Sequence, residues 1–224
     1  HISGYTGYRA APDTTELNYR RYLAIFEASS AFDNLAVRFS SSADRKKYLG
    51  TTRSPYWYIV SILEFEMSSS SNSYALVAES EYTSYDNESE IYLSTHFFRG
   101  GIRYRHRMGN LSSFYIEPRV ARMFCKTSKE ERYIEGSIVL GIDLFENKWF
   151  WLTASYEPGY RDYLLDGNPI YSDFTINRIS VIGSIHMSHS FSLDLFLSHE
   201  PEKHSRREDD FSISLISLEL KKGF

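Results

Sequence analysis

The sequence has little of what would cross-link the chain or carry it through a membrane as a helix. Cys125 is the one cysteine among 224 residues, so no disulfide can form within the chain. No apolar run approaches the roughly 18 residues that a membrane-spanning helix needs, and the most apolar stretch covers residues 56–63 only. The net charge of −4 shows no large excess of one sign, so composition gives nucleic-acid binding no support.

What the sequence has in abundance is aromatic residues in an alternating pattern. There are 18 Tyr and 15 Phe against six Pro, a composition that favours β-strands. Apolar and polar residues alternate with a period of two over long segments, as where Phe191, Leu193, Leu195 and Leu197 lie opposite Ser192, Asp194 and Ser198. A mean hydropathy of −0.39 agrees with a transmembrane β-barrel, because only every second residue of its strands must be apolar.

Turn-forming clusters divide the chain into about 12 strands within one domain, residues 1–224. The predicted strands are 2–10, 15–30, 34–42, 55–67, 73–85, 90–108, 112–126, 132–145, 148–160, 172–187, 190–200 and 210–224. Many exceed the usual soluble strand and match the length of a tilted strand that crosses a bilayer. Short links alternate with longer ones, which is typical of periplasmic turns and outer loops. The pattern predicts an all-β, closed antiparallel transmembrane barrel; a soluble protein of two facing sheets is the rival fold.

Two positions interrupt the regular strand pattern. The apolar face changes parity between Phe97 and Ile102, which predicts a β-bulge at Gly100-Gly101. Pro118 must either sit at another bulge or cost the sheet a hydrogen bond.

The C-terminal segment carries a family resemblance. Ile216, Leu218, Leu220 and the terminal Phe224 alternate with polar residues. This resembles the last strand of bacterial outer-membrane β-barrel proteins, which the barrel-assembly machinery recognises by a terminal aromatic preceded by alternate apolar residues; Lys222 departs from that pattern. The resemblance covers about a twentieth of the chain. It implies a location in the bacterial outer membrane, with assembly signal residues Phe224, Leu220 and Leu218, and lipopolysaccharide and other outer-membrane lipids as partners.

If the apolar faces meet lipid, the charged faces line a lumen, because bare charges in hydrocarbon are costly. The predicted lumen-lining residues are Arg103, Arg105, Arg107, Arg119, Arg178, Glu64, Glu66, Glu79, Glu81, Glu117, Glu135 and Asp194. Either the arginines form a basic track for anionic or sugar-like solutes, or they pair with the glutamates and close the interior. A barrel of 12 strands lies between filled and water-filled sizes, so both alternatives stay open.

No catalytic or metal-binding motif stands out, and no cofactor is expected. His186 and Ser188 share a face, as a base and its hydroxyl would, but Glu200 falls at the other end of the following strand. The acidic run Glu208-Asp209-Asp210 could hold a cation, although a solvated loop explains it as well. The basic runs 45–47 and 206–207 at the outer rim could contact lipopolysaccharide phosphate, or simply be solvated.

These observations favour a channel that passes small solutes, oligosaccharide or polysaccharide through a narrow charged lumen, as a porin or a polymer-export pore. The alternatives are an outer-membrane enzyme that modifies lipid and a structural or adhesion barrel closed by ion pairs.

Overall fold

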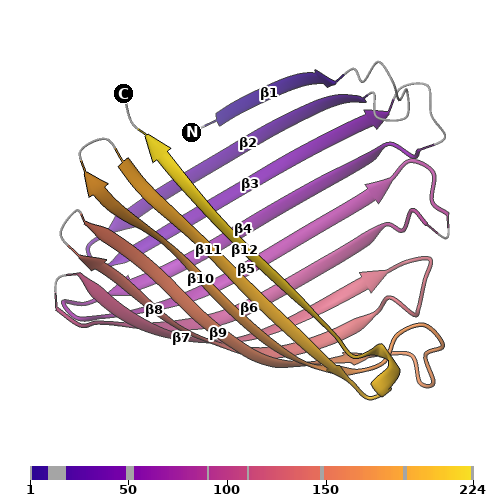
Figure 1. The fold of residues 1–224 in the computed structure, drawn as a ribbon. Coiled ribbons are helices and arrows are strands. Elements are labelled where there is room, and N and C mark those ends of the chain that lie inside the picture. Colours follow the sequence, from indigo (N-terminus) through magenta and orange to yellow (C-terminus); the bar gives the residue numbers. More distant parts are fainter. Residues whose placement is uncertain are drawn as a thin grey trace.

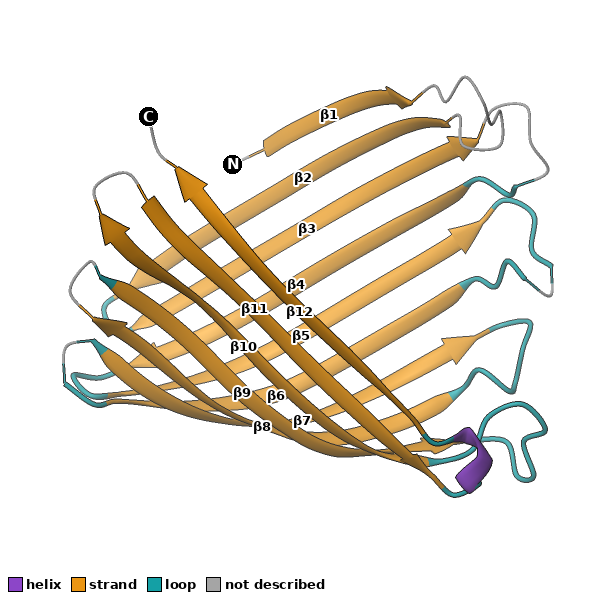
Figure 2. Ribbon diagram, viewed as in Figure 1, coloured by secondary structure: helices purple, strands orange, loops and turns teal. Residues whose placement is uncertain are grey.

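A computed structural model describes residues 2–9, 19–48, 53–89, 91–109, 111–146, 149–188 and 191–222. Within them the chain forms 12 β-strands and one short 3-10 turn (Figures 1 and 2). The strands are β1 (Ile2–Arg9), β2 (Tyr19–Phe32), β3 (Leu35–Tyr48), β4 (Tyr56–Ser68), β5 (Asn72–Tyr85), β6 (Thr95–Arg107), β7 (Ser112–Cys125), β8 (Tyr133–Glu146), β9 (Phe150–Tyr163), β10 (Phe174–Ser188), β11 (Phe191–His204) and β12 (Phe211–Lys222), with η2 (Arg207–Asp209) before β12.

Each strand pairs antiparallel with the next, in one sheet that runs in order from β1 to β12. The sheet curls back on itself, so that β9–β12 pass in front of β2–β6, and both termini lie at the same end (Figure 1). The described residues of β1 and β12 share no hydrogen-bonded ladder. The result is the predicted all-β, 12-stranded antiparallel barrel, with the longer links at the end opposite the termini.

The two faces of the sheet differ as the alternating pattern predicts. Large apolar side chains such as Ile102, Val120 and Leu218 are 56 to 65% exposed on the outer face. Charged side chains such as Glu117, Glu135 and Asp143 are buried on the inner face. An apolar exterior around a polar interior is the arrangement that a bilayer requires of a barrel. The barrel is therefore a membrane-spanning one.

In the described ranges, no helix is both long enough and apolar enough to span a membrane.

A row of three serines crosses part of the outer face, and its hydroxyls are satisfied locally. Ser41, Ser61 and Ser80 lie opposite one another on β3, β4 and β5. The hydroxyls of Ser41 and Ser61 are 2.9 Å apart, and Ser80 Oγ lies 2.9 Å from Nε2 of His96. Because each hydroxyl has a partner, the row avoids much of the cost of exposing polar groups to hydrocarbon.

Several strands run further toward the outer end than the sequence predicted. β3 continues to Tyr48, so the basic run 45–47 lies in a strand and not in a loop. β9 reaches Tyr163 and β11 reaches His204, three and four residues beyond the predicted ends. The charged residues and Pro201 in these segments predict loops, but at the rim of the barrel they continue the strands.

The predicted bulge at Gly100-Gly101 is wrong. Both glycines pair in uninterrupted register with Ala78 and Val77 of β5. Phe97 lies on the inner face, and it was the exposure assumed for this aromatic that suggested a change of parity. Pro118 sits opposite Ile138 of β8 without a bulge.

Pro118 interrupts the hydrogen bonding on the side of β7 that faces β6. The ladder between β6 and β7 has a gap between Gly101 and Tyr104, beside Pro118. A residue without an N–H cannot donate there, so the second of the two predicted alternatives holds.

Candidate functional site

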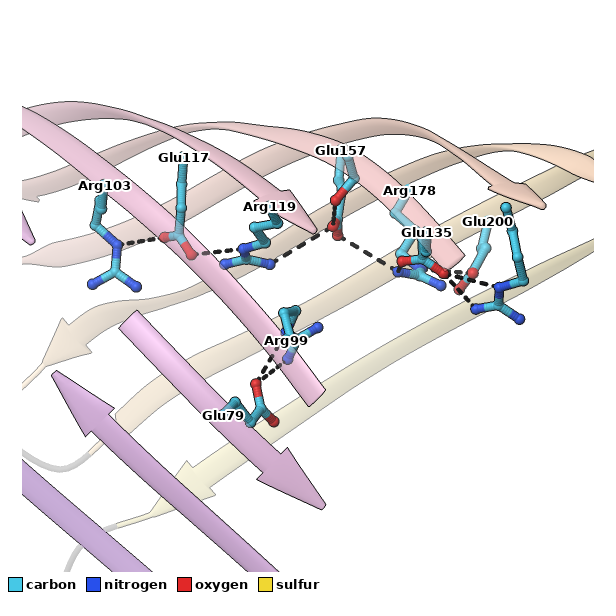
Figure 3. A network of polar contacts seen from close by, with 11 residues as sticks. Glu79, Arg99, Arg103, Glu117, Arg119, Glu135, Glu157, Arg178 and Glu200 are labelled. Carbon is cyan, nitrogen blue, oxygen red and sulfur yellow. Dashed lines mark hydrogen bonds and ion pairs between the residues drawn. The ribbon is translucent and has the colours of Figure 1, made fainter. Parts of the chain in front are cut away.

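The dominant polar feature is a chain of ion pairs that runs around the inner face from β3 to β11. We call it the charge belt; its members, in order, are Arg38, Glu64, Arg103, Glu117, Arg119, Glu157, Arg178 and Glu200. Positive and negative side chains alternate, and Figure 3 shows the part from Arg103 to Glu200. Seven strands contribute these side chains, which are β3, β4, β6, β7, β9, β10 and β11, so the belt extends across most of the sheet.

Glu117 is the most enclosed member. Its side chain is 3% exposed, and its two oxygens accept bonds from Nε of Arg103 at 2.6 Å and Nε of Arg119 at 2.7 Å. A Cβ atom on the neighbouring Gly101 would stand 3.1 Å from Glu117 Oε1. Gly101 thus leaves the space that this carboxylate occupies.

Small side chains let the belt cross strands that contribute no charge to it. Arg103 lies opposite Ala75 of β5, and its Nη1 reaches over that strand to Glu64 of β4 at 3.3 Å. Arg119 lies opposite Ser137 of β8 and reaches Glu157 of β9 at 3.7 Å. The hydroxyl of Ser137 donates to the same Glu157 at 2.7 Å.

A further carboxylate, Glu135 of β8, contacts the belt toward the outer end. Glu135 accepts a bond from Nη2 of Arg161 at 2.6 Å and lies 3.9 Å from Nη1 of Arg178. The guanidinium of Arg161 also lies over the rings of Tyr133, 4.0 Å from its centroid, and Phe174, at 4.9 Å. These contacts with the faces of two aromatic rings favour a fixed position for the Arg161 guanidinium.

The predicted lumen residues fall into distinct groups. Arg103, Arg119, Arg178, Glu64, Glu117 and Glu135 belong to the belt or contact it. Glu66 also contacts the belt, through Arg38. Four pairs are separate from it: Arg105–Asp143, Glu79–Arg99, Glu81–Tyr58 and Asp194–Lys221. Arg107, at the periplasmic end of β6, makes no ion pair with the described part of the chain. Of the three arginines at 103, 105 and 107, the first two are therefore paired with carboxylates.

Sequence reasoning missed Arg99 and Arg161. The false bulge at Gly100-Gly101 placed Arg99 on the wrong face, although its spacing from Arg103 is even. Arg161 was assigned to a loop because the strand was ended early. In both cases the period-two pattern, continued without interruption, would have found the residue.

A compact polar cluster lies at the outer end, between the loop before β10 and the turn before β12. Ser172 Oγ is 3.1 Å from His204 Nδ1 and 2.8 Å from Asp209 Oδ2. His204 Nε2 is 3.2 Å from Glu202 Oε2, and its ring stacks on Phe174 with centroids 4.6 Å apart. The hydrogen bond from Ser172 lowers the pKa of Asp209, so that carboxylate is ionised at neutral pH. We call these four residues the rim cluster: Ser172, Glu202, His204 and Asp209.

The other candidates for chemistry do not assemble. Glu200 bonds to Arg178, whereas His186 lies opposite Ser192, eight residues away along β11. The side chain of Ser188 lies outside the described residues. The described part of the chain holds no group of three His, Cys, Asp or Glu residues placed to bind a metal ion, and in the acidic run Asp209 and Asp210 bond to Ser172 and the His204 amide.

The expected assembly signal is only partly visible. Leu218 and Leu220 lie on β12 and are among the most exposed apolar side chains. Phe224 lies outside the described residues.

Comparison with known proteins identifies no family. No family model matches the sequence, and no curated protein does. Among solved structures, LpxR from Salmonella typhimurium matches with a TM-score of 0.43 and 10% identity, over 92% of this chain and 88% of that one. The siderophore receptor PiuA from Acinetobacter baumannii matches with a TM-score of 0.40 and 10% identity, over 98% of this chain and 46% of that one. Likenesses this distant carry no argument about function.

The class of protein follows from the chain's own structure. Twelve antiparallel strands of 8 to 15 residues, an apolar exterior and a charged interior define a β-barrel of the bacterial outer membrane. The particular function has to be argued from the inner face.

Proposed function

We propose that the barrel is a narrow channel and that the charge belt lines its lumen. The observation that carries this proposal is the direction of the ion pairs. Every ion pair between described strand residues joins side chains on one strand, on adjacent strands or on strands with one strand between them. Such pairs follow the wall and do not bridge the lumen, whereas a plug held by charges would need pairs between opposite walls.

Partial exposure of the inner cations supports the same proposal. The side chain of Arg38 is 53% exposed even though it pairs with Glu64 and Glu66. Arg99 and Arg178 each keep 30% of their side-chain surface accessible. Charged groups that line a solute path must stay accessible. A wall that carries both positive and negative charges suits small polar solutes that remain hydrated.

Conductance in planar lipid bilayers tests the channel. The folded full chain is expected to give discrete single-channel steps. Arg38→Gln removes the most exposed belt cation and leaves Glu64 and Glu66 in excess, so the reversal potential in a salt gradient should shift toward cation selectivity. Arg122→Gln is the matched control, because Arg122 is an exposed cation on the outer face, opposite Phe98. A barrel that shows heat-modifiable gel migration but never conducts would contradict the proposal.

A second candidate function, hydrolysis of a lipid ester, has one observation in its favour. The rim cluster links a hydroxyl, an imidazole and a carboxylate through Ser172, His204 and Glu202. In such a reaction Ser172 Oγ would bond to the ester carbonyl carbon, and His204 would take the hydroxyl proton and give it to the departing alcohol. Water would then release the fatty acid. Asp209 competes for the same proton, which is why this function ranks second.

The competition makes the test specific. If the rim cluster is hydrolytic, wild type should react with a fluorophosphonate probe, Asp209→Asn should react faster because His204 alone then accepts the proton, and Ser172→Ala should not react. A folded wild type and Asp209→Asn variant that both stay unlabelled would exclude this function.

A further inference from the structure

Two cations face each other on the outer surface of the barrel. Arg20 near the start of β2 lies directly opposite Lys47 near the end of β3, and both are exposed. Tyr22 and Phe26, which follow Arg20 at even spacing, are 46% and 42% exposed on the same lipid-facing side. Like charges directly opposite one another destabilise a strand pair, so this arrangement calls for a compensating anion.

The neighbouring cation is already neutralised. Arg45, two residues before Lys47, pairs with Asp86 through both guanidinium ends and lies 5.3 Å from the centre of the Trp57 ring. The hydrogen bond from Arg45 lowers the pKa of Asp86, with a smaller contribution from Lys47. Asp86 is therefore ionised and is engaged by Arg45. Arg20 and Lys47 make no ion pair with a described residue.

The position of Arg20 and Lys47 along the barrel indicates which region of the bilayer surrounds them. The start of β2, with Arg20, and the end of β3, with Lys47, lie at the end of the barrel opposite the chain termini (Figure 1). At this end Tyr22 of β2 and Trp57, near the start of β4, are exposed. Aromatic side chains of this kind mark the interface between hydrocarbon and headgroups. An anion that meets Arg20 and Lys47 from outside the barrel would thus belong to a lipid headgroup of the outer leaflet.

We propose that Arg20 and Lys47 form a binding site for a phosphate of an outer-leaflet glycolipid. The guanidinium of Arg20 can donate two parallel hydrogen bonds to phosphate oxygens, and the ammonium of Lys47 supplies a second point charge across the strand pair. Tyr22 and Trp57 contact the acyl region below. The phosphate removes the repulsion between the two cations, so lipid binding and strand pairing stabilise each other.

Native mass spectrometry of the full chain released from nanodiscs tests this site. The nanodiscs contain phosphatidylcholine with either bis-phosphorylated or dephosphorylated lipid A. Wild type should retain the phosphorylated form preferentially, and Arg20→Gln or Lys47→Gln should each reduce its retention about fivefold. Lys46→Gln is the matched control, because Lys46 is next in sequence but lies on the inner face, over the rings of Tyr19 and Tyr48.

A thermal measurement separates loss of the site from loss of the fold. In zwitterionic detergent without lipid A, Lys47→Gln should unfold at the same temperature as wild type or higher, because it removes a repulsion. When phosphorylated lipid A is added, the unfolding temperature of wild type should rise more than that of Lys47→Gln. Equal retention of both lipid forms by wild type, or an equal loss in Lys46→Gln, would overturn the proposal. So would equal stabilisation by inorganic phosphate alone, which would show that no lipid is required.

Discussion

The burial of Glu117 allows a quantitative test of the charge belt. Glu117→Gln keeps the size of the side chain but removes the charge that faces both Arg103 and Arg119. Removing one partner of a buried ion pair costs about 3–5 kcal/mol, because the remaining charge is left without compensation. The two arginines keep 24% and 20% of their side-chain surface exposed, so water can compensate them in part. We therefore expect the low end, about 3 kcal/mol.

The measurement is equilibrium unfolding in guanidinium of the barrel reconstituted in lipid vesicles, with the midpoint and slope recorded for each variant. Glu219→Gln provides the matched control. Glu219 also contacts a cation, Lys221 at 3.4 Å, but its side chain is 63% exposed. An exposed pair contributes at most about 1 kcal/mol, so this variant should differ little from wild type.

The reasoning fails if Glu117→Gln unfolds within about 1 kcal/mol of wild type with an unchanged slope, a loss no larger than that of an exposed pair. The inner wall would then hold its arginines without this carboxylate. A loss that Arg103→Gln fully restores in the double variant would instead identify repulsion between the two arginines as the cause.

Two further predictions concern neighbouring glycines and the outer rim. Gly101→Ala should destabilise the barrel by about 1–2 kcal/mol, because its Cβ would crowd Glu117 at 3.1 Å, whereas Gly100→Ala on the outer face has nothing within 4 Å and should be neutral or stabilising in the same unfolding assay. The pKa of Asp86 is lowered by Arg45, so the Asp86 pair stabilises the fold above the ordinary carboxyl range and loses that contribution as pH falls below about 4. The stability difference between wild type and Asp86→Asn should accordingly shrink on acidification; a difference that grows would contradict the assignment.

The strand count and the two faces could be predicted from the sequence because both depend on local chemistry. Period-two alternation determines which side chains share a face, and clusters such as 69–72 determine where a strand must turn. Strand ends were less accurate. In a soluble protein a charged stretch such as 45–47 marks a loop, but inside or at the rim of a barrel the same residues continue the strand.

The rim cluster could not be predicted for a different reason. Ser172 and His204 are 32 residues apart, and the contact with Asp209 depends on the short turn η2. No spacing within either segment marks the serine as a partner of the histidine. Contacts of this kind arise only when loops at one end of the barrel converge.

The partners within the charge belt lie beyond sequence reasoning because pairing depends on the stagger between strands. Arg103 and Arg105 are two residues apart on the same face of β6, yet the first reaches Glu64 and Glu117 and the second reaches Asp143 on β8. Two residues along a strand span about 7 Å. The guanidinium groups of Arg103 and Arg105 are therefore too far apart to meet the same carboxylates. The pairs are therefore set by register and by small side chains such as Ala75, which the arginine must cross. Replacing Ala75 by Leu should block that crossing and separate Arg103 from Glu64, while Ala78→Leu on the outer face should leave the inner pairs intact.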